Sequence, residues 1–111
     1  MILAMFAAAI SLQPAEETPP PAVEQAGQAW ANCIGEGVDA APARGSERGA
    51  ARAILANCRT LQTRMVEAYG SWVSASSLSA ADKRSAIAAT QRTIDGMEAQ
   101  ITAAIRASRA N

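Results

Sequence analysis

The chain has 111 residues, ten Lys or Arg against ten Asp or Glu, and no His. A net charge of zero argues against a nucleic-acid-binding protein, which normally carries an excess of basic residues. The absence of His removes the commonest general base, and the sequence has neither a Gly-rich phosphate loop nor a nucleophile elbow, which argues against an enzyme.

Residues 1–12 form an uncharged apolar run that Gln13, Pro14 and Ala15 follow. Such a run is typical of the core of a secretory signal peptide, although no Lys or Arg precedes it and no clean cleavage signal follows it. It is shorter than the roughly 20 residues that span a bilayer. We therefore expect residues 1–15 to be a cleavable signal peptide, and the mature protein to be periplasmic or secreted with no integral membrane span.

Residues 16–19 are an acidic, Pro-rich spacer, and a single helical domain is expected over 20–111. Because Pro is tolerated in a first helical turn, the prolines there predict the start of a helix over about 20–39. Its apolar residues recur every three or four positions and share one face. They are Val23, Ala26, Trp30, Cys33, Ile34 and Gly37.

Residues 40–46 contain Pro42 and Gly45 and end on Ser46, which predicts a turn followed by a helix N-cap. A second helix is expected over 47–74, because its apolar residues keep a three-four rhythm for three heptads. They are Ala51, Ile54, Cys58, Leu61, Met65, Ala68 and Trp72.

Ser79 followed by Asp82 predicts a capping box and a third helix over 80–108. The inward positions of this helix are Ile87, Thr90, Ile94, Met97, Ile101 and either Ala104 or Ile105. Short connections make neighbouring helices antiparallel. The sequence therefore predicts an all-α fold, an antiparallel three-helix bundle that runs up, down and up.

Cys33 and Cys58 fall on the inward faces of the first two helices, at similar distances from the turn between them. This predicts a disulfide-linked helical hairpin, and closing a loop of about 25 residues stabilises it by roughly 3 to 4 kcal/mol. The alternative is a thiol/disulfide redox protein, although the pair lacks the Cys-x-x-Cys spacing. With no His and no carboxylate cluster near either Cys, we expect no metal site and no cofactor.

Arg48, Arg52 and Arg59 fall within about 40° of one another on a helical wheel, to one side of the apolar face. They form a candidate interaction site for an anion or an acidic partner. The interpretation that we favour is that they pair with the acidic residues of helix 20–39.

Trp72 lies at the height expected for Pro20 and Pro21. Packing of its ring on these prolines is the simpler interpretation. The alternative is an exposed aromatic site for a partner.

The segment Leu78-Ser79-Ala80-Ala81-Asp82-Lys83-Arg84 resembles the Leu-Thr-x-x-Gln helix starts of periplasmic stress chaperones of the helical-hairpin type, over seven residues and without the Gln. The resemblance implies a periplasmic helical chaperone or a stress-sensing accessory. The main expectation is a small, exported, non-enzymatic protein that acts through helix-helix contact in the cell envelope. Its partner would be another protein or a second copy, on the part of the second and third helices that the shorter first helix leaves uncovered.

Overall fold

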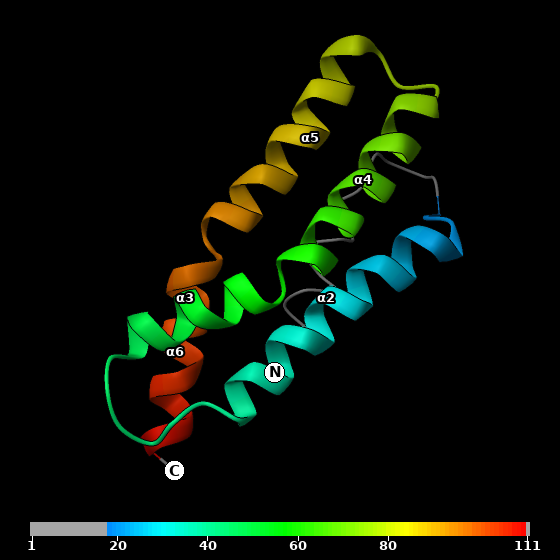
Figure 1. Cartoon of the computed structure of the whole chain (residues 1–111). Helices are drawn as coiled ribbons and strands as arrows, with labels where there is room; N and C mark the ends of the chain where they lie inside the picture. The colour runs from blue at the N-terminus through cyan, green and yellow to red at the C-terminus, as the bar shows by residue number, and fades with distance from the viewer. Residues whose placement is uncertain (1–17, 111) are drawn as a thin grey trace.

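The structure is a computed structural model that describes residues 18–110. The regular elements in this range are all helices, labelled in Figure 1: α2 (Pro21–Asp39), α3 (Glu47–Asn57), α4 (Arg59–Ala75), α5 (Ala80–Asp95) and α6 (Met97–Ala110). The predicted signal peptide lies outside the described residues. Within 18–110, no helix combines the length and the hydropathy that a membrane crossing requires.

The helix starts follow local chemistry. Pro21 occupies the first position of α2. The hydroxyl of Ser46 accepts a hydrogen bond from the Gly49 amide at 2.9 Å, and the hydroxyl of Ser79 accepts one from the Asp82 amide at 3.1 Å. These side chains satisfy amides that the first helical turn leaves without a backbone partner. The starts predicted at Ser46 and Ser79 are therefore confirmed.

The second and third predicted helices are each interrupted once. Cys58 separates α3 from α4, and Gly96 separates α5 from α6. Hydrogen bonds of helical spacing meet at both breaks. Cys58 donates to the Ile54 carbonyl and accepts from the Gln62 amide, both at 3.0 Å, and Gly96 donates to the Arg92 carbonyl at 3.1 Å and accepts from the Gln100 amide at 3.3 Å. The breaks are therefore bends within two longer helical segments. Gly has a low helix propensity, and Cys58 is fixed from outside its helix by a disulfide.

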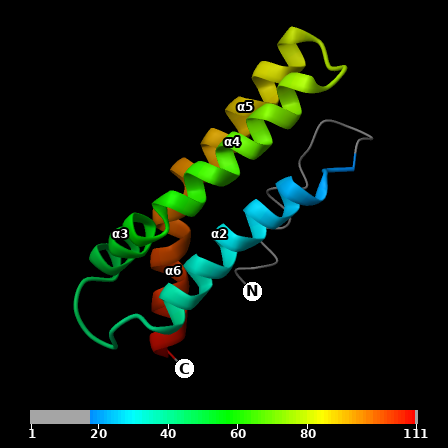
Figure 2. The ribbon, with the colours of Figure 1, turned by 45° about the vertical axis from the view of Figure 1, so that its right-hand side comes forward.

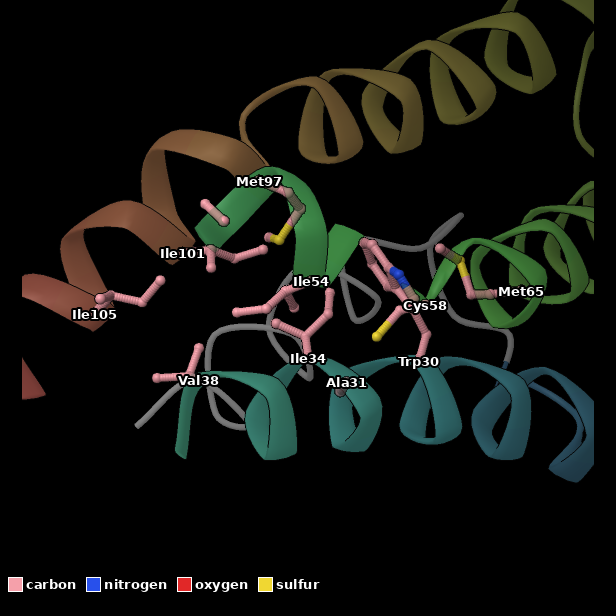
Figure 3. Close-up of a cluster of buried hydrophobic side chains, with 11 residues drawn as sticks. Trp30, Ala31, Ile34, Val38, Ile54, Cys58, Met65, Met97, Ile101 and Ile105 are labelled. Atoms are coloured by element: carbon pink, nitrogen blue, oxygen red, sulfur yellow. The ribbon is translucent and has the colours of Figure 1, made fainter. Parts of the chain in front are cut away.

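The main core lies where α2, α3 and α6 meet, and Figure 3 shows its side chains pointing into the space between these helices. Its buried members are Trp30, Ala31, Ile34, Val38, Ala51, Ile54, Cys58, Met65, Met97, Ile101 and Ile105. A second, smaller cluster lies nearer the other end of α4. Its buried members are Val23, Tyr69 and Val73.

The chain is an elongated body of 48 × 23 × 22 Å in which α4 lies between α2 and α5 (Figures 1 and 2). α2 packs mainly on α4, α3 packs mainly on α6, and α5 packs on α4. α5 contains no buried residue, and Ile87, an expected core position, is 44% exposed. The all-helical class is therefore confirmed, whereas a three-helix bundle along the whole length is not.

The loop between α2 and α3 is held by the far end of the chain. Arg109 donates from Nη1 to the Gly45 carbonyl at 3.0 Å and from Nη2 to the Pro42 carbonyl at 2.8 Å. Gly45 has a φ of 95°, a left-handed conformation that Gly adopts without steric cost. Arg109 also lies 3.8 Å from the Glu47 carboxylate. These contacts keep α6 helical to Ala110, beyond the predicted end at residue 108.

Candidate functional site

The predicted disulfide is confirmed. Cys33 and Cys58 are bonded, with their Cα atoms 5.9 Å apart. Cys58 is 1% exposed and precedes the first residue of α4. A helix N-terminus can stabilise a thiolate, but here Cys58 also ends α3, because its amide donates to the Ile54 carbonyl at 3.0 Å, and its sulfur is held in the disulfide. The position of Cys58 therefore fits a structural role.

The predicted arginine site lies beside α6. Arg52 donates from Nε to Oε1 of Glu98 at 2.9 Å, and Nε of Arg48 lies 3.7 Å from Oε2 of the same carboxylate. The side chains of Arg48 and Arg52 are 69% and 64% exposed. One carboxylate thus faces two guanidinium groups, which leaves an excess of positive charge on this side of α3.

The expected pairing of these arginines with helix 20–39 is wrong. Within residues 18–110, the ion pairs join arginines to Glu47 and Glu98, and none involves an acidic residue of α2. The physical reason is the side of α3 on which these arginines lie, because Arg48 and Arg52 point to the side of α3 that faces α6. Arg59, the third predicted member, is exposed and has no acidic partner within 4 Å among the described residues.

Along α4, the side of the helix that carries these arginines continues to Val66, an exposed apolar residue. Arg48, Arg52, Arg59 and Val66 are spaced by four and seven residues, so they lie on one side of the α3–α4 segment. Ile87 and Glu98 are eleven residues apart, which is three helical turns, so they share one side of the α5–α6 segment. The contacts of Arg48 and Arg52 with Glu98 show that these two sides adjoin where α3 packs on α6.

We call the surface where these two sides meet the lateral seam. Its members are Arg48, Arg52, Arg59 and Val66 on α3 and α4, with Ile87 and Glu98 on α5 and α6. Val66 and Ile87 are 38% and 44% exposed. The shared side of the three arginines could be predicted from the sequence. The exposure of Val66 and Ile87 could not, because both residues occur in helices with apolar faces.

Trp72 lies in the smaller core cluster and is half-buried. Its ring meets that of Tyr69 edge to face, with centroids 5.9 Å apart and an interplanar angle of 64°. This geometry is favourable for aromatic pairs and anchors Trp72 within the protein. The structure does not bring Trp72 together with the three arginines, which lie further back along α3 and α4.

A shallow groove of about 540 Å³ lies between the end of α2, the following loop and α3. Its walls are mostly small side chains, and Arg44 is the charged residue among those that line it. They are Gly37, Ala40, Ala41, Pro42, Arg44, Ser46, Gly49, Ala50, Ala53, Ile54 and Asn57. The groove brings no carboxylate pair or nucleophile together, so we assign it no chemical role.

Two further observations bear on chemistry. Across residues 18–110, no group of three or more His, Cys, Asp or Glu side chains could hold a metal ion. Burial raises the pKa of Tyr69 above 10.0, and the hydrogen bond with the Thr90 side chain opposes this shift. Tyr69 is therefore a neutral phenol at physiological pH, not an activated base.

Comparisons of the chain with protein families, curated proteins and solved structures found no match. The function must therefore be argued from the residues of the lateral seam.

Proposed function

We propose that this chain is an exported, non-enzymatic protein that acts in the cell envelope by helix-helix contact through the lateral seam. The observation that carries the proposal is the exposure of Ile87 and Val66, 44% and 38%, on helices that adjoin one another. Exposed apolar residues that gather on one side mark an interaction surface more often than singly scattered ones do. The arginines beside them supply charge that can orient a partner.

The compartment in this proposal is periplasmic or extracellular, reached through cleavage of residues 1–15. The Cys33–Cys58 disulfide supports it, because such bonds persist mainly in oxidising compartments. The proposed scaffold is the antiparallel arrangement of three helical segments, in which α2 leaves one side of the α4–α5 pair uncovered. Envelope location and helix-helix contact together define a binding module.

Site-specific photocrosslinking in the native host tests the proposal. A benzophenone amino acid replaces Ile87, and a control places it at Asn32, an exposed residue of α2. We expect a discrete protein adduct from position 87 only, and we expect Val66→Asp to abolish it. Ser71→Asp, at an exposed position elsewhere on α4, should leave the adduct intact. An adduct that is equally strong from position 32, or insensitive to Val66→Asp, would contradict a specific seam.

The alternatives make different predictions. A periplasmic chaperone or stress-sensing accessory would suppress aggregation of an unfolded client at near-stoichiometric ratios, and a thiol redox protein would turn over small thiols. For the chaperone, the resemblance at Leu78–Arg84 is the support, and Ser79 and Asp82 act there as an ordinary helix cap. For the redox protein, the burial of Cys58 is unfavourable.

A further inference from the structure

We propose that the outer surface of α3 and α6 docks on an anionic lipid surface, a layer of phosphodiester head groups, through Arg48, Arg52 and Arg106. This inference goes beyond the proposed function and does not depend on it. It rests on the charges of the α3–α6 half of the molecule, whereas the proposed function rests on the exposure of Val66 and Ile87 on α4 and α5. Three observations carry it: the layering of the charges, the atoms by which the arginines are held, and the charge of the opposite surface.

On this surface the arginines are far more exposed than the carboxylates that hold them. The side chains of Arg48, Arg52 and Arg106 are 69%, 64% and 68% exposed. Those of their partners, Glu98 on α6 and Glu47 on α3, are 37% and 23% exposed. The carboxylates therefore lie beneath the guanidinium groups, and an approaching surface meets mainly positive charge.

Each of the three guanidinium groups approaches its carboxylate through Nε. Nε of Arg52 donates to Glu98 at 2.9 Å, and Nε of Arg48 lies 3.7 Å from the same carboxylate. Nε of Arg106 donates to Glu47 at 3.0 Å. The other donors of a guanidinium are on its two Nη atoms, and this end of the fork binds phosphate oxygens in pairs. The carboxylates thus orient the arginines and leave the Nη end for a ligand outside the protein.

The three arginines are spread over two helices. Arg48 and Arg52 are about one turn apart on α3, and Arg106 follows Glu98 by about two turns on α6. Two hollows lie at this end of the molecule, the groove of about 540 Å³ and a smaller one beside Ser108, and none of the three arginines lines either. A small anion needs polar groups that converge in a concave site. Donors spread over an open surface instead fit a plane of phosphate groups.

The neighbouring side of α5 and α6 does not cancel this charge. Arg84, Asp95 and Arg106 are spaced by eleven residues, about three helical turns, so they lie on one side of this segment. All three are exposed. Because two arginines accompany the one acid, this side also carries a net positive charge.

The opposite surface of the same half is acidic. α2 contains three acidic residues and no basic one. Two of them, Glu36 and Asp39, are exposed and lie about 200° and 140° round the helix from the buried Ile34, so they point away from the core. Across that core, residues 40–57 and 97–110 contain five Arg and two Glu. This polarity turns α3 and α6 toward a negatively charged plane and α2 away from it.

Co-sedimentation with lipid vesicles tests the proposal, on the disulfide-intact protein purified from its host. At low salt the protein should bind vesicles that contain about one third phosphatidylglycerol, because each arginine near an anionic surface strengthens binding by about fivefold. It should not bind vesicles of phosphatidylcholine alone. Binding should be lost as the salt is raised toward about 1 M, where charges are screened beyond about 3 Å.

Two substitutions remove charge without leaving a carboxylate unpaired. After Arg52→Gln, Glu98 still faces Arg48. After Arg106→Gln, Glu47 still has a second arginine 3.8 Å away. Both variants should therefore fold, which circular dichroism checks. Each should weaken vesicle binding by about fivefold, and the two substitutions together by about twentyfold.

Arg64→Gln is the matched control, because it removes the same charge from an exposed position of α4, outside the α3–α6 half. It should change binding by less than about twofold. Equal losses for Arg52→Gln and Arg64→Gln would mean that net charge alone drives binding, and would overturn the proposal.

Absence of binding to the anionic vesicles at low salt would overturn it as well. Binding to a poly-glutamate peptide that Arg52→Gln weakens, with none to vesicles, would assign the surface to an acidic protein instead. The photocrosslinking result at position 87 is independent of these outcomes, so a Val66-dependent adduct would still support the proposed function if lipid docking failed.

Discussion

Cys33, in the middle of α2, is bonded to Cys58 at the bend where α3 passes into α4. One covalent link therefore joins three helices at the edge of the main core. The residues lie 25 positions apart. Closing a loop of that length should stabilise the protein by about 3 to 4 kcal/mol, on the chain-entropy account.

The first prediction concerns this bond. Cys33→Ala combined with Cys58→Ala should lower the free energy of unfolding by about 3 to 4 kcal/mol in urea denaturation. Wild-type protein reduced and alkylated under denaturing conditions should show a similar loss. A loss below about 1 kcal/mol would mean that the helices are held in register without the disulfide.

The second prediction compares the same substitution, Ile to Ala, at the two ends of the molecule. Ile101 is 1% exposed in the main core, and Ile87 is 44% exposed on the lateral seam. Ile101→Ala should cost about 2 to 5 kcal/mol, because it removes buried contacts and leaves a cavity. Ile87→Ala should cost less than about 1 kcal/mol. Equal losses in thermal or urea unfolding would show that α5 is packed more tightly than the structure indicates.

The third prediction tests the close approach of α2 to α3. A Cβ at Gly37 would lie 2.8 Å from Cγ1 of Ile54, so the side chain or the helices must shift. Gly37→Ala should therefore destabilise the protein by about 1 to 3 kcal/mol. A Cβ at Gly35, on the same helix, would meet no neighbouring side chain or backbone within 4 Å. Gly35→Ala should instead stabilise by up to about 1 kcal/mol, and the opposite signs are the outcome to measure.

The fourth prediction concerns alkaline pH. Burial raises the pKa of Tyr69 above 10.0, so the folded state holds this proton more tightly than the unfolded state does. The resulting stability is fully present below pH 10 and is lost as the pH rises through the folded pKa. Tyr69→Phe should cost about 1 kcal/mol at neutral pH, through the lost hydrogen bond with Thr90.

Comparing the wild type with Tyr69→Phe separates the contribution of Tyr69 to the pH dependence of stability from that of other groups that titrate in the same pH range. Unfolding free energies from pH 8 to 11 should fall more steeply for the wild type than for Tyr69→Phe. Parallel curves would mean that the phenol is solvated in the folded state.

The helix starts could be predicted from the sequence because their signals are local. Ser46 and Ser79 need only an amide three residues ahead, and both form that bond. The disulfide was also predictable, since Cys33 and Cys58 lie at similar distances from one turn. The bends at Cys58 and Gly96 were not, because the apolar rhythm passes through them unchanged.

The inward face of α4 shows why periodicity was insufficient beyond Met65. The sequence rhythm predicted Ala68 and Trp72, whereas Tyr69 and Val73 are the buried residues. α4 packs on α2 along one side and on α5 along another, so its most buried residues lie between the two directions. One stripe of apolar residues at heptad spacing is the pattern of a helix that packs on one neighbour.

The partner of the arginines could not be found from local spacing. Glu98 lies 46 residues after Arg52, and only the packing of α3 on α6 brings them together. Charge segregation between helix 20–39 and the arginine stripe favoured the wrong partner, because charge alone does not specify which side of a helix faces which neighbour.

The two core clusters differ greatly in size: the one around Ile101 is large, and the one around Tyr69 has three buried residues. Local opening of the α4–α5 end therefore requires less free energy than unfolding of the end that the disulfide secures. The exposed strip at Val66 and Ile87 belongs to this more compliant half. The protein thus presents its candidate contact surface on the part that can most readily adjust its shape to a partner, while the cross-linked half stays fixed.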